Sequence, residues 1–574
     1  MQRRCQSAGG SFLLRSRATR FAPWVAWSLI ALAAGCGGGS DPDPAGSDSS
    51  SGDPSSTPPP SSPSPPASPP PTPTVSTDVV TYRNDLSRTG QNLTESVLTL
   101  ANVKSATFGL KRVLAVDGKV DAQPLYLSQV TLNSTKRNVV YAATEHGSVW
   151  AFDADTGDKV WQVSLVPSGE STSDDHTCGQ ITPEIGITST PVIDRTAGAN
   201  GTLYVVVMSK GASSTYHQRI HALDVTTGAE LLGGPTEISA TYPTAAGGTA
   251  TFDPGQHAER AALLLLNGTV YTTWTSHCDF APYSGWVIAF DAKTLARGAV
   301  LNIAPNSGAG PSIWMAGGGP AADSAGNIYL LTANGLFDTT LDANGFPNQH
   351  DYGNSFVKIT PGTGSLAVND YFTMMNEVAE SAADLDLGSG GGILLPDVTD
   401  GGGVTRHLMV GAGKDGNIYV VNRDSMGKFS PTANNNWQTL PSVVTAIFST
   451  PAYFNGTVYY GGINSGLKAF PIVNAKLAAQ PASQSATQFA RPGSAVAVSA
   501  NGTSNGIVWA HENANPAVLH AYDATNLANE LYNSNQAANN RDNFGAGNKF
   551  ITPTIADGKV FVGTTSGVAV FGPL

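Results

Sequence analysis

Gln123-Pro124-Leu125-Tyr126 opens a stretch that continues with Val139-Val140-Tyr141-Ala142 and then with Gly147-Ser148-Val149-Trp150-Ala151-Phe152-Asp153-Ala154-Asp155-Thr156-Gly157. A proline leads into an apolar run, two more apolar runs follow, and the last one closes on an acidic turn before Val160-Trp161. Short runs rich in Val, Tyr, Ile and Phe between Gly, Asn and Asp turns are typical of β-strands. The stretch therefore predicts a unit of about four short strands.

Partial copies of this unit recur down the chain. The copies begin near residues 122, 189, 262, 318, 392, 449, 496 and 551. Self-similarity at such a period indicates a repeat architecture, and four strands per unit favour the blades of a β-propeller. An open β-solenoid is the alternative, but its repeats are shorter and more uniform. We predict an all-β, eight-bladed β-propeller, with eight blades favoured over seven.

The last unit, residues 551–574, is too short to form a whole blade. A strand from the N-terminal side, starting near Thr81 or Phe108 and ending at Val116, would complete it. Ring closure of this kind removes the unpaired edge that an incomplete blade would expose.

The N-terminal part reads as a targeting segment rather than as part of the fold. Five arginines precede an apolar run over residues 21–34, and Ala33-Ala34-Gly35 comes directly before Cys36. This order is typical of a secretory signal, and it resembles the lipobox of bacterial lipoproteins with Cys36 as the lipidated residue. A signal anchor is the alternative, although about 14 apolar residues are few for a membrane span.

Three regions are therefore expected. Residues 1–35 form the lipoprotein signal peptide, residues 36–77 form a lipidated Gly/Ser/Pro-rich tether, and residues 78–574 form the propeller. This organisation predicts a lipid-anchored protein of the bacterial cell envelope, at the outer membrane on its periplasmic or surface face. No second apolar run is long enough to span a membrane, so membrane contact is expected through the lipid alone.

The charge and the cysteine content limit which partners and which covalent links the chain can have. The net charge is −12 and the basic residues are scattered, which argues against a nucleic-acid partner. Cys178 and Cys278 are left once Cys5 and Cys36 are assigned to the targeting segment, and in an oxidising compartment they predict a disulfide. His176 and His277 lie close to them, so a metal site is the alternative.

The turn from Ala151 to Trp161 resembles the tryptophan-docking repeat of quinoproteins that bind pyrroloquinoline quinone (PQQ). Longer stretches resemble the PQQ-dependent alcohol dehydrogenases of that class: Tyr82-Arg83-Asn84-Asp85 to Val103, Ile313-Trp314, Asn327 to Gly335, Asp351 to Ser355, Asp384-Leu385-Asp386-Leu387, and Gly413-Lys414-Asp415 to Arg423. The order of these stretches along the chain is similar to that of the family.

The resemblance implies a set of roles. Trp314 would form the floor on which the quinone stacks, and Lys414 would contact the quinone oxygens. Asn334 and Asp386 would bind a calcium or lanthanide ion. Asp386 would also be the general base that accepts the proton of an alcohol or sugar during hydride transfer. Asp384 is the alternative base, or a second carboxylate near the metal.

Two features of that family are missing from this chain, and their absence leaves other functions open. The chain lacks the adjacent cysteine pair, and no carboxylate stands near Ser213, where the family has a calcium-binding glutamate; Glu184 or Asp279 could substitute. It also has no Cys-x-x-Cys-His, so an enzyme would need a separate electron acceptor. The alternatives are a non-catalytic propeller scaffold or ligand-binding lipoprotein that contacts envelope proteins, or a carbohydrate-binding or carbohydrate-degrading surface protein.

Overall fold

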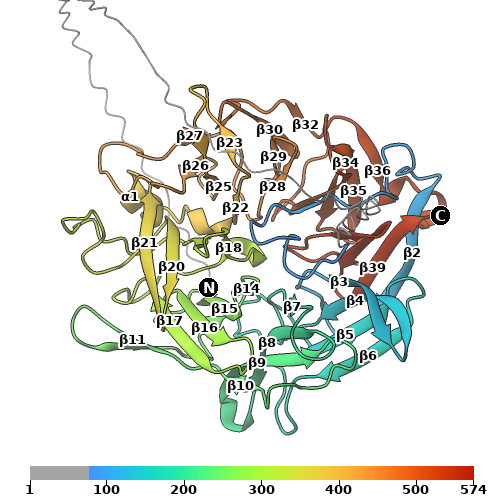
Figure 1. Cartoon of the computed structure of the whole chain (residues 1–574), viewed down its shortest axis with the longest axis horizontal. Coiled ribbons are helices and arrows are strands. Elements are labelled where there is room, and N and C mark those ends of the chain that lie inside the picture. The colour runs from blue at the N-terminus through green and yellow to red at the C-terminus, as the bar shows by residue number, and fades with distance from the viewer. Residues whose placement is uncertain (1–76) are drawn as a thin grey trace, which may run out of the picture. The chain divides into compact units, whose positions relative to one another are not determined.

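The computed structural model describes residues 77–574, which form eight sheets of four or five strands and two separate two-stranded hairpins. The sheets follow one another around a common centre (Figure 1). The prediction of an all-β, eight-bladed propeller is confirmed. The signal peptide, Cys36 and residues 37–76 of the tether lie outside the described residues.

Seven blades have their strands in chain order from the inner to the outer edge, except that β13 and β14 both pair with β15 and that β31 and β32 both pair with β30. Blades one to four contain β3 to β6 (Leu125–Leu132, Thr135–Ala143, Ser148–Asp153, Lys159–Ser164), β7 to β10 (Val192–Asp194, Thr202–Lys210, Tyr216–Asp224, Thr236–Glu237), β13 to β17 (His257–Ala258, Leu264–Leu266, Thr269–Ser276, Trp286–Asp291, Arg297–Asn302) and β18 to β21 (Ala321–Ala322, Ile328–Leu331, Ser355–Gly362, Ser365–Thr373). Blades five to seven contain β22 and β25 to β27 (Gly392–Leu394, Leu408–Ala412, Ile418–Asn422, Gln438–Leu440), β28 to β32 (Ala452–Phe454, Thr457–Tyr460, Lys468–Val473, Lys476–Leu477, Ser483–Gln484) and β33 to β36 (Val496–Asn501, Ser504–Glu512, Val518–Asp523, Glu530–Asn533).

The eighth blade joins both ends of the described chain. Its strands β37 (Thr554–Ala556), β38 (Lys559–Gly563) and β39 (Gly567–Pro573) are completed by β2 (Phe108–Ala115), which pairs antiparallel with β39. The expected N-terminal closing strand is therefore confirmed, with the start at Phe108. β1 (Gln91–Asn92) also belongs to the N-terminal segment and runs parallel to β33.

The tryptophan turn links adjacent blades as the sequence predicts. Asp153 Oδ1 accepts hydrogen bonds from the backbone N–H groups of Asp155 and Thr156, which fixes the turn. Trp161 then reaches the next blade, where its indole N–H donates to the carbonyl of Val225 over 3.0 Å. Its ring lies against Gly228, where a Cβ would come within 2.6 Å of it. A glycine is needed there because the ring occupies that space.

The N-terminal segment from Val79 to Asn92 crosses the centre of the ring and contacts all eight blades. Val79 bridges Tyr126 of blade one, Arg88 donates to the carbonyl of Leu263 at the start of blade three, and Asn92 donates to the carbonyl of Ile555 in blade eight. Five backbone carbonyls of the segment accept hydrogen bonds from the inner strands of the other blades: Val80 from Ile193, Leu86 from Ala322, Ser87 from Leu394, Thr89 from Tyr453, and Gly90 from Val498.

Two fully buried arginines hold this segment. Arg83 donates to the carbonyls of Pro451 and Val496, and Arg88 donates to the carbonyl of Pro320 over 2.9 Å. Because each guanidinium joins different blades, the segment ties the inner strands together at the axis. The acceptors are backbone carbonyls and, for Arg88, also the Thr81 hydroxyl. Burial lowers the pKa of both arginines, and the charge of Asp85 acts against that effect.

Outside the blades lie the hairpins β11–β12 (Thr241–Pro243, Thr249–Thr251) and β23–β24 (Val398–Thr399, Thr405–Arg406) and the helix α1 (Glu377–Ala382). Over residues 77–574, no helix has both the length and the apolar character needed to cross a membrane.

Candidate functional site

A cavity of about 640 Å³ opens among the loops of the propeller. All five residues that the sequence places in a redox site line it: Trp314, Asn334, Asp384, Asp386 and Lys414. They come from four separate segments of the third to fifth blades and the loops between them. The structure thus brings the five side chains together, while their chemical roles stay predictions.

Asp386 is held by groups from two neighbouring blades. Its Oδ1 accepts a hydrogen bond of 2.8 Å from the backbone N–H of Asn334, and its Oδ2 pairs with the ammonium of Lys414. Only 7 % of the residue is exposed, and burial raises the pKa of Asp386 despite the neighbouring Lys414. A buried carboxylate with a raised pKa and an open cavity beside it has the properties of a general base.

Lys414 connects the two acids of the site. Its Nζ lies 2.8 Å from Asp384 Oδ1 and also pairs with Asp386. Burial works against the charged ammonium, but Asp386 and Asp384 raise the pKa of Lys414, so the lysine stays charged. Lys414 therefore does not pair with Asp415, which instead accepts from Asn417 and Tyr419.

Two glycines allow the segments of this site to approach so closely. A Cβ on Gly413 would lie 2.2 Å from the carbonyl oxygen of Asp386, and a Cβ on Gly388 would lie 2.5 Å from the carbonyl carbon of Thr332. Asn334 adds a hydrogen bond of 3.0 Å from its Nδ2 to Asp384 Oδ1. Close backbone contacts explain the Gly-rich sequence around Asp386 better than flexibility does.

Trp314 lies in the loop between the third and fourth blades, directly before the short 3₁₀ turn Met315–Gly317. Its ring is half-buried and lines the cavity. Within residues 77–574, no other aromatic ring packs on Trp314 in a stacked or edge-on contact. The indole therefore presents an area to the cavity that a flat ligand could cover.

The two candidate substitutes for the missing glutamate separate in the structure. Asp279 lines the cavity, whereas Glu184 accepts from Thr172 and lies 3.0 Å from the Nδ1 of His146. Among the described residues, no group of three or more His, Cys, Asp or Glu side chains could hold a metal ion.

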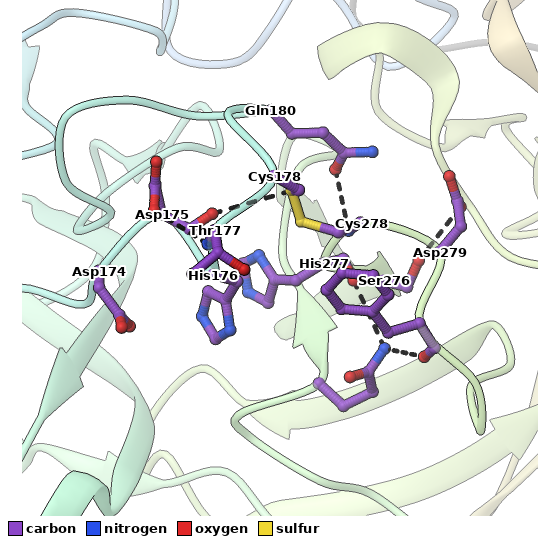
Figure 2. The surroundings of a disulfide bond; sticks show 12 residues. Asp174, Asp175, His176, Thr177, Cys178, Gln180, Ser276, His277, Cys278 and Asp279 are labelled. Atoms are coloured by element: carbon purple, nitrogen blue, oxygen red, sulfur yellow. Dashed lines mark hydrogen bonds between the residues drawn. A yellow bond between two sulfur atoms is a disulfide. The ribbon is translucent and has the colours of Figure 1, made fainter. Parts of the chain in front are cut away.

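The expected disulfide is present between Cys178 and Cys278 and links the loop after the first blade to a loop of the third (Figure 2). The Gln180 amide oxygen accepts a hydrogen bond of 3.1 Å from the Cys278 backbone N–H. The imidazoles of His176 and His277 stack in parallel 4.3 Å apart beside the bond (Figure 2). Because Gln180 and Asp279 line the cavity, the disulfide supports part of its wall.

Sequence reasoning missed three cations that line the same cavity: Arg260, Arg491 and Lys549. Arg260 lies between β13 and β14 of the third blade, and the other two lie before the seventh and eighth blades. Each is a basic residue in a loop, so nothing local in the sequence distinguishes it from a surface charge.

Comparisons with known proteins agree with this architecture. Residues 116–272 match the protein family described as outer membrane protein assembly factor BamB. No curated protein sequence is significantly similar to the chain.

Three solved structures share the fold across most of the chain. The quinohemoprotein alcohol dehydrogenase from Comamonas testosteroni has a TM-score of 0.56 and 15% identity, covering 86% of this chain and 80% of its own. The enzyme ADHIIG from Pseudomonas putida HK5 has a TM-score of 0.56, 14% identity and the same coverage. A europium-containing methanol dehydrogenase has a TM-score of 0.55 and 14% identity, covering 86% of this chain and 98% of its own.

These three structures share the fold of the chain, and stretches of its sequence resemble the PQQ-dependent alcohol dehydrogenases. The chain therefore has the eight-bladed propeller fold of the quinoprotein alcohol dehydrogenases, and the resemblance drawn from its sequence is confirmed at the level of the fold.

Proposed function

We propose that the chain is a PQQ-type quinoprotein that oxidises an alcohol or sugar in the central cavity, with Asp386 as the base. The observation that carries this proposal is the meeting of Trp314, Asn334, Asp386 and Lys414 in one cavity wall. Their segments are separated by tens of residues in the chain, and the fold brings all four to the lining of one cavity.

The residues present fit a flat, anionic quinone. Trp314 offers an aromatic area without a stacking partner among the described rings, and Lys414 offers an ammonium close to the base. Aromatic rings pack well on flat conjugated ligands, and cationic groups stabilise quinone oxygens. When bound, PQQ would supply the two-electron acceptor for the hydride, which no side chain can supply.

Asp386 would then take the hydroxyl proton of the substrate. The Asn334 N–H and Lys414 fix the orientation of its carboxylate, so Asp386 Oδ1 and Oδ2 have defined positions before substrate arrives. Lys414 also stabilises negative charge on an oxygen close to Asp386. The bound proton can leave Asp386 through the same cavity once product has gone.

A dedicated calcium or lanthanide site does not fit the residues as well. Calcium binds six to eight oxygen ligands in proteins. Asp384, Asp386 and the Asn334 amide lie close together, but the Lys414 ammonium already pairs with both carboxylates, and within residues 77–574 no group of three or more His, Cys, Asp or Glu side chains could hold a metal ion. A second positive charge would be repelled at this position. No step of the proposed reaction is therefore assigned to a metal.

The cellular setting follows from the N-terminal sequence and belongs to the proposal. A lipid anchor at Cys36 would hold the protein in the cell envelope, and a separate acceptor would take the electrons because the chain has no Cys-x-x-Cys-His.

A non-catalytic propeller scaffold that contacts envelope proteins is the second candidate. The match of residues 116–272 to the assembly-factor family favours it, and so does the lack of the adjacent cysteines and of the glutamate. In that case the blades and the cavity would serve to bind a partner or ligand, without redox chemistry.

The test is to add PQQ to the full chain, alone and with Ca²⁺ or La³⁺, and to follow quinone absorption and the dye-linked oxidation of a panel of alcohols and sugars. We expect PQQ to bind, and Asp386→Asn to keep PQQ binding while it loses oxidation. Failure to bind PQQ at micromolar concentration would contradict the proposal and favour the scaffold.

A further inference from the structure

We propose that Arg260, Arg491 and Lys549, which we call the cationic wall, bind the carboxylate of an acidic, polyhydroxylated ligand such as a sugar acid. This inference deepens the proposed function by naming a substrate class, and it rests on that function only for the oxidation step. Binding itself needs no cofactor.

The cationic wall is built around two phenylalanine rings. The Arg260 guanidinium carbon lies 4.5 Å from the centre of the Phe550 ring, and Lys549 Nζ lies 5.7 Å from the same centre. Arg491 lies over the Phe448 ring at 4.6 Å. All five residues line the cavity. The aromatic rings hold the cations in place without forming an ion pair with them.

No carboxylate of residues 77–574 lies within 4.0 Å of the charged nitrogens of the cationic wall. Arg260 is nevertheless only 6 % exposed. A buried arginine is normally paired, because burial of an isolated charge is unfavourable. Burial, followed by the nearby charge of Arg260, lowers the pKa of Lys549 to about 8. The positive charges of the cationic wall therefore repel one another.

The acids closest to the cationic wall are already used. Asp121 pairs with Lys119 over 3.4 Å and accepts a hydrogen bond from Asn548. Glu145 accepts from the Gly186 N–H, and burial, followed by the charge of Asp121, raises its pKa well above the usual range. Burial lowers the pKa of Arg260, and the charges of Asp121 and Glu145 act against that effect, but neither acid forms an ion pair with the cationic wall. An anionic ligand would therefore be its direct partner.

The form of the cavity indicates what the rest of the ligand looks like. A volume of about 640 Å³ is far larger than an inorganic anion and lies in the range that small organic ligands occupy. The amide side chains of Gln180, Asn334 and Asn513 line it together with Trp314 and Tyr283. Amides can pair with several hydroxyl groups, and aromatic rings can pack on a sugar ring.

Carboxylates could also come from PQQ, so the experiment must separate the two sources. Isothermal titration of the full chain without cofactor would compare galacturonate with galactose, which lacks the charge. We expect galacturonate to bind at least about tenfold tighter, because charge-assisted hydrogen bonds to the cations are lost with the neutral sugar. Equal binding of the two sugars, or no binding of galacturonate, would overturn the inference.

Variants test which residues are responsible. Lys549→Met and Arg491→Gln should each weaken galacturonate binding by about tenfold and leave galactose binding unchanged. Lys476→Met, at an exposed lysine of the sixth blade, is the matched control and should bind both sugars as the parent does. Parent-like galacturonate binding by both wall variants would overturn the assignment of this wall.

Proton uptake gives a second readout. An anion next to Lys549 raises its pKa, so the complex should take up protons at pH 8 to 9, measured as a dependence of the binding heat on the buffer. Lys549→Met should abolish the uptake; uptake that persists in this variant would count against the assignment.

A last titration adds PQQ and measures whether it competes with galacturonate. If PQQ competes with galacturonate, the cationic wall holds the cofactor and the substrate assignment is wrong. If PQQ and galacturonate bind at the same time, the assignment of the cationic wall to a substrate carboxylate is supported. If PQQ does not bind and galacturonate does, the quinoprotein proposal fails while the anion site is upheld.

Discussion

The backbone N–H of Asn334 donates a hydrogen bond of 2.8 Å to Asp386 Oδ1, joining the fourth blade to the segment that leads into the fifth. Lys414, from the fifth blade, pairs with the other oxygen of the same carboxylate. Asp386 is thus oriented by two blades at once. A displacement of either blade would change the geometry of the base, so the chemistry of this site depends on an intact ring.

Replacement of Lys414 by methionine should reveal how strongly Asp386 depends on it. Without the ammonium, burial of Asp386 is uncompensated, so its pKa rises further. The variant should lose about 2 kcal/mol of unfolding free energy at pH 7, less than for a fully buried pair because the Lys414 side chain is 18% exposed. Urea unfolding measures this loss.

The direction in which the unfolding free energy of this variant changes with pH follows from the pKa of Asp386. A carboxyl whose folded pKa is raised stabilises the fold below its unfolded pKa, and this contribution disappears as the pH rises through the folded value. Lys414→Met should therefore lose stability relative to the parent from about pH 4 upward. Lys293→Met, at an exposed lysine, is the control; equal pH profiles of the two variants would contradict the ion pair.

Arg88 should be among the most sensitive positions of the fold. Arg88→Met would leave the buried carbonyls of Pro320, Tyr82 and Leu263 without their donors. Each unsatisfied buried acceptor costs about 1–3 kcal/mol, so we expect a total loss of at least about 3 kcal/mol. Denaturant unfolding checks this, with the exposed Arg297→Met as control. A similar small loss in both variants would show that the N-terminal segment is dispensable.

Removal of the disulfide should destabilise the fold without opening the ring. The bond closes a loop of 100 residues, and a bridge of this kind typically contributes about 2–4 kcal/mol. The double variant Cys178→Ala, Cys278→Ala should lose that amount in thermal or urea unfolding. A thiol reductant should destabilise the parent and leave the variant unaffected; destabilisation of both by the reductant would point to another cause.

His511, in β34 of the seventh blade, should make the protein sensitive to acid. Burial, followed by the charge of His520, lowers the pKa of His511 to about 4. A histidine with a lowered folded pKa stabilises the fold at neutral pH, and this contribution is lost as the pH falls below the unfolded value of about 6.5. From pH 7 to pH 5 this corresponds to about 2 kcal/mol.

The variant His511→Gln isolates that contribution. It should start less stable at pH 7 but lose less than the parent between pH 7 and pH 5 in urea unfolding. The neighbouring His520 titrates in the opposite sense, because Glu512 and Glu530 raise its pKa against the effect of burial. Identical slopes for parent and variant would show that His511 is not the group that titrates.

The blade pattern was predictable because it is local. Repeat starts near residues 122, 189 and 449 precede first strands at Leu125, Val192 and Ala452, since proline and turn residues act within a few positions. The closing strand was predictable for a different reason, because an incomplete last blade requires a partner.

The five residues of the candidate site were also found from the sequence, through short stretches that resemble a known family. The contacts between these residues could not be found in this way. Asp415 is the chain neighbour of Lys414, but the structure pairs Lys414 with Asp384 and Asp386 instead. Such contacts depend on which loops the ring brings together, and no periodicity encodes that.

By itself, the sequence determined that this chain builds β-blades, with eight favoured over seven, and that its last blade borrows a strand from the N-terminal side; it favoured a Cys178–Cys278 disulfide over a metal site, and the structure decided between them. Strand alternation, turn residues and the need to pair the edge of an incomplete blade suffice for these conclusions. Only the tertiary structure decided that Val79 to Asn92 contacts every blade at the axis, and that Arg260, Arg491 and Lys549 meet in one cavity. Those contacts join loops far apart in the chain, and they exist only once the ring has closed.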